Sequence, residues 1–305
     1  MRAQGDGVRA GPARTLPAAA RRSARRRRGG GETAWLLWLL LPALVVMLVC
    51  FVTPLGVMLA RSLTDPSPAN YLKFFDSAVY PQALAYTLGM ALAVTLLCVL
   101  LGYPFAYLMH RCGPGWRMLL TLVVLLPFWS SLLVRTYAWT ILLRDTGLIN
   151  WVLLESGLVD KPVRLMGNSI GVLIGMTHIM LPFLVLPLYA GMQRIDDRLV
   201  VAAASMGAAQ RTIFRRVFLP LSLPGLAAGS LLVFALSVGF YVTPALLGGR
   251  TAFYTLLIDM QVNRLLDFGF GSTLAIILLL VVLLIVGLGS RLVRLDQVFG
   301  RPGGA

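Results

Sequence analysis

Few side chains in this sequence are of the types that catalyse reactions or bind metal ions. The 305 residues include two histidines, His110 and His178, and three cysteines, Cys50, Cys98 and Cys112. Their spacing matches no metal site, and no serine or cysteine stands with a base and an orienting group as a nucleophile requires. The G-x-x-x-x-G-K-(S/T) loop that binds nucleotide phosphates is also absent from the sequence. We therefore expect neither an enzyme nor a nucleotide-binding protein, and no metal or other cofactor.

The segment most suited to a specific task is residues 196–226, which read DDRLVVAAASMGAAQRTIFRRVFLPLSLPGL. Asp196 or Asp197 is a suitable N-cap for a first helix. On that helix, one face would carry Leu199, Ala202, Ala203 and Met206. Gly207 then permits a sharp turn, or a close contact that a side chain would obstruct. The first half of the segment is predicted to be a short helix that ends at a glycine turn.

A second short helix is expected after this turn. Its apolar pairs lie four residues apart, namely Ile213 with Val217 and Phe214 with Phe218, while Arg211 and Arg215 share another face. Pro220 and Pro224 mark the return of the chain into an apolar run. The whole pattern predicts a helix–turn–helix with a knob of small residues that a partner protein could grip.

Composition indicates which elements position this segment. Apolar residues make up 58% of the sequence and charged residues 13%, against roughly 45–50% and about 25% in soluble domains. Apolar runs without internal charge lie at residues 34–60, 83–109, 118–134, 168–190, 223–247 and 271–290. Each is long enough, or nearly so, to cross the roughly 30 Å hydrocarbon core of a bilayer. The fold class is therefore predicted to be an all-α integral membrane protein with six transmembrane helices.

The basic residues predict how these spans are oriented. With six spans, residues 1–33, 110–117, 191–222 and 291–305 share one side and hold 19 of the 27 Lys and Arg residues, and the other side holds 8. By the positive-inside rule the first side is cytoplasmic, with both termini. We expect residues 1–33 to be a disordered, arginine-rich segment that contacts anionic lipid rather than nucleic acid, and residues 296–305 to be a short cytoplasmic tail.

Other features concern the outer segments and the packing of the spans. Residues 135–166 and 254–266 carry apolar side chains near helical spacing, which predicts short amphipathic helices and a docking surface on the outer face. The pairs Gly171/Gly175 and Gly225/Gly229 are spaced for close helix approach. For residues 196–226, an interfacial helix that only rests on lipid headgroups remains the alternative to a partner-binding loop.

Residues 196–226 resemble the EAA loop of binding-protein-dependent ABC importer permeases. That loop reads Glu-Ala-Ala, three residues, Gly, a variable stretch and Leu-Pro, and here Ala202, Ala203, Gly207 and Leu219-Pro220 match it. Val201 stands where the family has glutamate, which removes one salt bridge or hydrogen bond to the ATPase. Residues 125–137, 164–189 and 237–249 resemble the spermidine/putrescine subfamily.

The resemblance implies a type I ABC importer permease (MetI-like) fold over residues 34–295, with a coupling loop at about 196–220, in the bacterial inner membrane. It implies as partners a cytoplasmic ATPase dimer, a second and non-identical permease subunit, and an extracytoplasmic solute-binding protein. The residues expected to couple to the ATPase are Ala202, Ala203, Gly207, Arg211, Phe214, Leu219 and Pro220. The solute is expected to be a polyamine, and other small polar solutes carried by related permeases remain open.

The candidates for the wall of the translocation path are Phe128, Trp129, Ser130, Tyr241, Thr243 and Pro244. Aromatic rings suit a polyamine, since cation–π attraction reaches about 2 kcal/mol when desolvated. However, no Asp or Glu lies inside a predicted span to pair with an ammonium group. The competing hypothesis is an ion-coupled secondary transporter, for which His178 is the one titratable candidate well inside a span. We expect that histidine to be packed and hydrogen-bonded rather than a proton relay.

Overall fold

The computed structural model describes residues 18–65, 67–249 and 251–299, and every regular element in these ranges is helical. The elements are α1 (Ala18–Thr64), α2 (Asn70–Asp76), α3 (Val79–Arg111), α4 (Pro114–Trp129), α5 (Leu132–Leu142), α6 (Leu148–Glu155), α7 (Ser169–Met192), α8 (Asp197–Ser205), α9 (Gln210–Ile213), η1 (Phe214–Phe218), α10 (Leu219–Val238), α11 (Val242–Leu247), α12 (Tyr254–Asp259), η2 (Met260–Arg264) and α13 (Phe268–Phe299). Five helices are long and apolar enough to cross a membrane, and a sixth span results if α4 and α5 count as one. The predicted all-α membrane fold is confirmed.

The first 57 residues form a unit of their own. The described part of this unit belongs to α1, which contains the candidate span Leu40–Thr64. Because α1 begins at Ala18, residues 18–33 are helical where the sequence analysis expects disorder. The alanines and arginines of this stretch favour a helix although Gly29, Gly30 and Gly31 oppose it, and the stretch is continuous with the helix of the span. Residues 1–17 of that segment lie outside the described residues.

The centre of the second unit is a packed group of three helices, α3, α7 and α10. A Cβ atom at Gly225 of α10 would lie 3.2 Å from the Cα atom of Gly191 in α7. One at Gly229 would lie 2.9 Å from the carbonyl oxygen of Leu184. The backbones of α7 and α10 therefore touch at two places where only glycine fits, as the spacing of Gly225 and Gly229 predicts.

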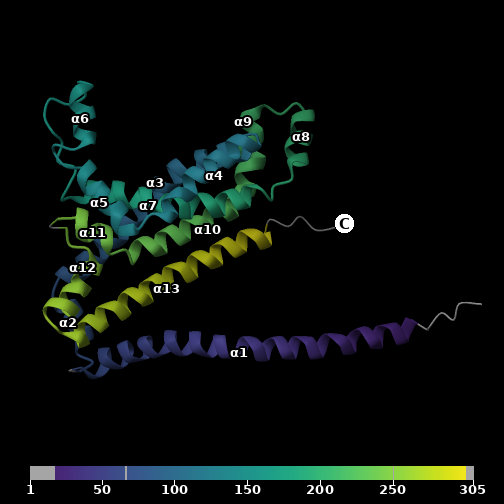
Figure 1. Cartoon of the computed structure of the whole chain (residues 1–305), viewed down its shortest axis with the longest axis horizontal. Coiled ribbons are helices and arrows are strands. Elements are labelled where there is room, and N and C mark those ends of the chain that lie inside the picture. The colour runs from purple at the N-terminus through teal and green to yellow at the C-terminus, as the bar shows by residue number, and fades with distance from the viewer. Residues whose placement is uncertain (1–17, 66, 250, 300–305) are drawn as a thin grey trace, which may run out of the picture. The chain divides into compact units, whose positions relative to one another are not determined.

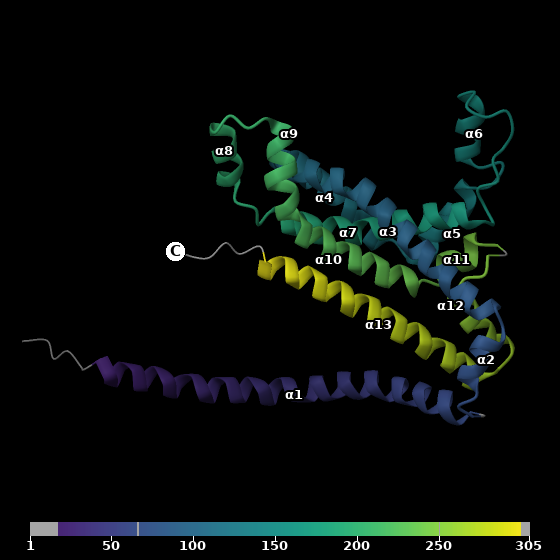
Figure 2. The ribbon, with the colours of Figure 1, turned by 180° about the vertical axis from the view of Figure 1, so that it is seen from behind.

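A smaller core joins α2, α3, α12 and α13. Tyr254 is fully buried there; its hydroxyl donates to the Leu274 carbonyl at 3.1 Å, and its N–H donates to Oγ1 of Thr87 at 2.9 Å. Figures 1 and 2 show α12 at the same end of this unit as α5, α6 and α11, and α8 and α9 at the opposite end. The short helices thus divide between the two ends of the bundle.

Two of the predicted spans differ from the structure. The run 118–134 is not one straight helix, because α4 ends at Trp129 and the chain turns by 100° into α5. The run 223–247 is displaced: the helix runs from Gln210 to Val238, and α11 follows as a separate short helix. The short helices expected within 135–166 and 254–266 are present as α5, α6, α12 and η2.

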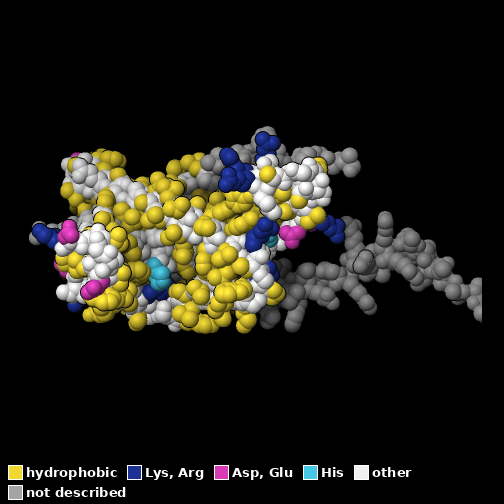
Figure 3. All heavy atoms as spheres, turned by 90° about the horizontal axis from the view of Figure 1, so that it is seen from above, with side chains coloured by type: hydrophobic (Ala, Val, Ile, Leu, Met, Phe, Trp, Pro, Cys, Tyr) yellow, Lys and Arg dark blue, Asp and Glu magenta, His cyan; other side chains and the backbone are white. Residues whose placement is uncertain are grey.

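Hydrophobic side chains cover much of the surface. Exposed leucine, valine and phenylalanine side chains occur along α1, α3, α4 and α13. Figure 3 shows broad areas of hydrophobic side chains, in yellow, on the face in view. Soluble monomers rarely expose apolar patches this extensive, whereas lipid-facing helices do so routinely. The surface therefore agrees with an integral membrane protein.

Candidate functional site

The predicted helix–turn–helix lies at one end of the bundle (Figure 1). Asp196 caps α8, since its Oδ1 atom accepts a hydrogen bond of 2.9 Å from the backbone N–H two residues later. At the other end of α8, Gly207 has a φ angle of +82°. The Gly207 N–H donates to the Ala204 carbonyl, and the Ala208 N–H donates to the Ala203 carbonyl. These bonds form a Schellman cap, whose positive φ favours glycine. Both the cap and the turn confirm the prediction for this helix.

The outward side of α8 consists of apolar and small side chains. The sequence places Ala203 on one face with Leu199, Ala202 and Met206, but the structure buries Ala203 and leaves the other three exposed. Met206, next to the turn, is 82% exposed, and Val201, at the position of the family's glutamate, is 63% exposed. Apolar side chains this exposed at an end of the bundle are suited to contact a partner.

The second helix is longer than predicted. It begins at Gln210 and continues without interruption through Pro220 and Pro224 to Val238. The reason is the π-helical turn η1, in which the Leu219 N–H donates to the Phe214 carbonyl five residues earlier. Proline has no N–H and crowds the preceding turn, and a wider turn accommodates it without a break. The prolines therefore lie within the helix and do not mark its start.

An aromatic cluster joins this helix to the end of α3. Phe214 and Phe218 are stacked, with ring centroids 6.2 Å apart. Tyr107 of α3 packs edge-on against both rings, at 5.3 and 5.1 Å, and His110 lies 5.2 Å from Phe218. The predicted Phe214/Phe218 pair is thus present, and its partner is α3.

Two polar contacts extend this junction in opposite directions. The hydroxyls of Tyr103 on α3 and Ser222 on α10 share a hydrogen bond of 3.0 Å. At the other end of the cluster, Nε2 of His110 lies 3.9 Å from a carboxylate oxygen of Asp197, the first residue of α8. The C-terminal half of α3 thus contacts both α8, through His110, and α10, through Tyr103.

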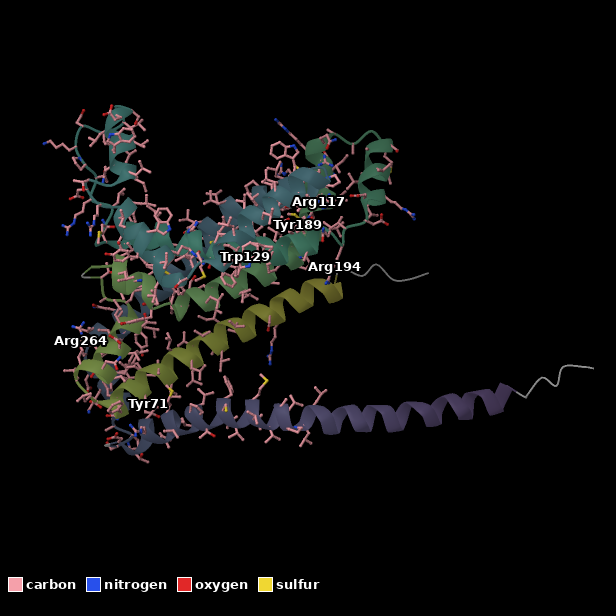
Figure 4. All side chains as sticks on the ribbon, in the orientation of Figure 1. Tyr71, Arg117, Trp129, Tyr189, Arg194 and Arg264 are labelled. Carbon is pink, nitrogen blue, oxygen red and sulfur yellow. The ribbon has the colours of Figure 1, made fainter. Side chains whose placement is uncertain are left out.

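Basic residues surround the same end of the bundle. Arg211, Arg215 and Arg216 are exposed and, with Thr212, line one open groove. Figure 4 shows Arg117 and Arg194 at this end too. The predicted shared face of Arg211 and Arg215 is thus present on the surface of the helix.

The 100° bend between α4 and α5 is stabilised by Arg135. Its guanidinium donates hydrogen bonds to the carbonyls of Pro127 and Ser130, the latter at 3.1 Å, and to Oγ of Ser130 at 3.3 Å. The Ser130 hydroxyl also donates to the Pro127 carbonyl at 2.9 Å. The last carbonyls of a helix lack partners within it, and a cation there also meets the negative end of the helix dipole. Beside this bend Phe128, Trp129 and Ser130 are exposed, Trp129 by 79%.

The residues predicted on the path near α11 divide into two groups. Tyr241, which precedes α11, is 41% exposed. Thr243 and Pro244 are buried, and Oγ1 of Thr243 lies 3.4 Å from Oγ1 of Thr136 in α5. Of the six predicted path residues, four are therefore exposed and two are buried, and of these two Thr243 contacts α5.

His178 differs from the expectation of a packed residue. It is hydrogen-bonded, because the indole N–H of Trp139 donates to its Nδ1 atom at 3.2 Å, but its side chain is exposed. The sequence contains both residues, yet they are 39 positions apart, and only the bend after α4 brings them together. No local pattern indicates this pair.

Comparison with known sequences gives consistent matches. Residues 16–293 match the profile of a family described as "Binding-protein-dependent transport system inner membrane component". The spermidine/putrescine transport system permease protein PotB of Haemophilus influenzae is 34% identical over 258 residues, which cover 83% of this chain and 89% of that protein. PotB of Escherichia coli is 37% identical over 229 residues, which cover 74% and 83% of the two chains.

Solved structures give the same fold. A chain of a bacterial alginate ABC transporter, in complex with its pentasaccharide-bound periplasmic protein, superposes with a TM-score of 0.71, 19% identity, and coverage of 86% of this chain and 95% of that one. A chain of the methionine ABC transporter MetNI, in an inward-facing conformation, superposes with a TM-score of 0.55 and 19% identity over 72% and 96% of the two chains.

Proposed function

The chain belongs to the family of binding-protein-dependent transport system inner membrane components, and from this premise we propose that it forms half of the transmembrane path of an importer for polyamines. Membership of this family agrees with the prediction that the chain is a permease subunit and not an enzyme. The observation that carries the choice of solute is the 34% and 37% identity to spermidine/putrescine permeases over most of the chain. Spermidine and putrescine are therefore the proposed solutes.

We propose that α8, the Gly207 turn and the helix that follows bind a separate cytoplasmic ATPase dimer. Movements driven by ATP hydrolysis would reach the permease through this segment. The exposed apolar side chains beside the turn support this proposal, as do the exposed arginines on the next helix. The proposed coupling residues are Ala202, Ala203, Gly207, Arg211, Phe214, Leu219 and Pro220. Phe214 is proposed to act inward, because its ring packs on Tyr107 of α3 rather than facing solvent fully.

The path is proposed to run beside the bend and α11, lined by Phe128, Trp129, Ser130 and Tyr241. Their exposure supports this role, and their aromatic rings suit ammonium groups through cation–π attraction. For the buried Thr243 and Pro244 we propose a supporting role, in which they position Tyr241. A second, non-identical permease subunit is proposed to supply the other half of the path, and a solute-binding protein to dock on the outer ends of α5, α6 and α12.

The orientation follows from the distribution of basic residues. The end with α8 and α9 carries Arg117, Arg194 and the three arginines around Thr212 (Figure 4), and we propose that it faces the cytoplasm. Both termini are then proposed to be cytoplasmic in a bacterial inner membrane. Residues 1–33 would form a basic segment at the lipid surface, 34–295 the permease domain, and 296–305 a short tail.

Uptake measurements test the proposal. The chain would be produced with its own ATPase, second permease and binding protein in cells that lack polyamine uptake, and radiolabelled spermidine and putrescine would be supplied. We expect saturable uptake that requires ATP and stops when the ATPase subunit is inactive. ATP-dependent uptake of a different solute, with no transport of either polyamine, would retain the permease and refute the choice of solute.

A further inference from the structure

His178 occupies an unusual position in the most buried span. Between Gly171 and Tyr189 of α7, it is the one side chain that is exposed, and its neighbours Thr177 and Ile179 are buried. As the tenth residue of α7 it lies about 14 Å along the helix axis from Ser169, near the middle of the span. A polar ring at this depth is stable only beside water or a polar partner. The exposed edge of His178 therefore faces a wet or polar space rather than lipid.

Trp139 determines the protonation of this ring. Its indole N–H donates to Nδ1 of His178 at 3.2 Å, and the two rings meet edge-on with centroids 5.5 Å apart. Indole nitrogen is only a donor, so Nδ1 must be the acceptor and carry no proton. The single proton of the imidazole is then on Nε2, and the ring is neutral.

The ionisable groups near His178 include one permanent positive charge. Arg135 of α5 is the closest cation to consider, and its guanidinium is directed at the carbonyls that end α4. The other groups at this level are Tyr86, which contacts Ser169, and Cys98, which contacts the Thr177 carbonyl, both from α3. On α4 the ionisable residue is Arg117 in its first turn, and α10 and α11 contain none. The partial negative charge at the end of α4, about half an elementary charge, offsets only part of the charge of Arg135. The Trp139 bond keeps His178 from adding a second positive charge.

We propose that His178 lines the translocation path as a specificity-determining residue and that Trp139 holds it neutral, so that this ring adds no positive charge to that of Arg135 where a cationic solute passes. This inference rests on the proposed transport of polyamines. A protonated ring at this position would repel an ammonium group in a region where solvent screening is weak. The Trp139 hydrogen bond is lost if the ring accepts a second proton, and the bond thereby opposes protonation.

The first experiment compares uptake of radiolabelled putrescine by the complete importer at pH 8.0 and 6.0, as the ratio of each variant to the unmodified protein. Trp139→Phe keeps an aromatic ring but removes the N–H donor. Without this donor, Nδ1 of His178 is free to accept a proton as the pH falls, so the ratio should be lower at pH 6.0 than at pH 8.0. The matched control, Trp139→Phe with His178→Gln, should show no such fall, because glutamine does not titrate.

Two further variants test the position of the ring. His178→Lys places a fixed charge there and should abolish uptake at both pH values. The uptake of His178→Gln relative to the unmodified protein should be the same at both pH values. The amount of each variant in the membrane is checked by immunoblotting. Transport by His178→Lys at the level of His178→Gln, or a Trp139→Phe ratio that does not change with pH, would overturn the inference.

A measurement without transport separates this inference from the proposed function. The chain has two histidines, so His110→Gln leaves a single one for ¹⁵N-histidine NMR of the full chain in lipid nanodiscs. We expect a neutral imidazole with its proton on Nε2 at pH 6.0, and a larger doubly protonated fraction in Trp139→Phe at the same pH. A doubly protonated ring in the presence of Trp139 would refute the inference. If the unmodified importer carried no polyamine, the proposed function would fail while this spectrum still reported on the ring.

Discussion

Gly207 allows the coupling proposal to be tested with two substitutions that separate backbone strain from partner contact. Its φ angle is +82°, and a Cβ atom there would meet no heavy atom of the chain within 4 Å. The Cβ atom of either alanine or leucine therefore fits, and because Gly207 is exposed, the rest of a leucine side chain can extend away from the chain. Both residues carry the same backbone cost of about 1–2 kcal/mol for a left-handed conformation. That cost lowers the population of the observed turn by about 5- to 30-fold relative to other conformations.

The comparison of Gly207→Ala with Gly207→Leu isolates the contact with the partner. Because the strain is common to both, any additional loss in the leucine variant must come from atoms outside this chain. We expect the ratio of solute transported to ATP hydrolysed, measured in proteoliposomes with the complete importer, to fall at least a further tenfold from alanine to leucine. The thermal unfolding midpoint of the isolated permease should be the same for both variants.

A third variant controls for the turn itself. Asparagine adopts left-handed conformations more readily than alanine, so Gly207→Asn should restore part of the turn while adding a side chain. If alanine and leucine gave equal ratios of transport to hydrolysis, no partner would pack against Gly207, and the docking role of the turn would be refuted. A loss of thermal stability in the leucine variant alone would mean that its side chain clashes inside the permease itself. We do not expect this result, because no atom of the chain lies within 4 Å of a Cβ atom at this position.

Three further predictions concern other parts of the structure. Phe218→Ala removes a 5% exposed ring from the α3 junction, and we expect about 3–5 kcal/mol of local destabilisation and ATP hydrolysis that continues while uptake falls. Arg135→Met leaves the carbonyls at the end of α4 without their donor. Hydrogen bonds to charged groups contribute about 1.5–3 kcal/mol each, so the thermal unfolding midpoint of the permease should fall. Arg135→Lys, which keeps a charged donor, should recover part of this loss. Gly229→Leu forces a side chain against the Leu184 carbonyl and should prevent α7 and α10 from packing. The expected result is a loss of monodisperse protein in gel filtration. The control Gly239→Ala, at a position where a Cβ atom meets no atom within 4 Å, should elute as the unmodified chain does.

Features that depend on neighbouring residues could be predicted from the sequence. Asp196 caps α8 and Gly207 ends it because both act through backbone groups within a few positions. The close contact of Gly225 and Gly229 with α7 was also readable, since small residues four apart favour helix approach. Composition and the length of apolar runs were sufficient for the helical class and for five spans, and the sixth depends on counting α4 and α5 together.

Features that depend on distant contacts could not be predicted. The end of α4 at Trp129 depends on Arg135, whose guanidinium folds back across the bend to reach the Pro127 carbonyl. Residues 118–134 form an apolar run whether or not the helix continues through them, so the hydropathy pattern does not reveal the break after Trp129. Likewise, whether Pro220 interrupts a helix depends on whether the preceding turn widens, and the composition of η1 gives no sign of that.

The packing of α10 suggests how movement at the cytoplasmic end could reach the path. Its helix starts in the segment proposed to dock on the ATPase and ends at Val238, three residues before Tyr241. Along the way its backbone touches α7 at Gly225 and Gly229, too closely for either helix to slide past the other without separating. A displacement of η1 must therefore carry α7 and α10 together, and with them the level of His178. Tyr103 and Tyr107 attach α3 to the same segment, and we therefore infer that α3, α7 and α10 move as one body. The bend beside Arg135 then separates this body from α5, which can stay in place while the three helices move.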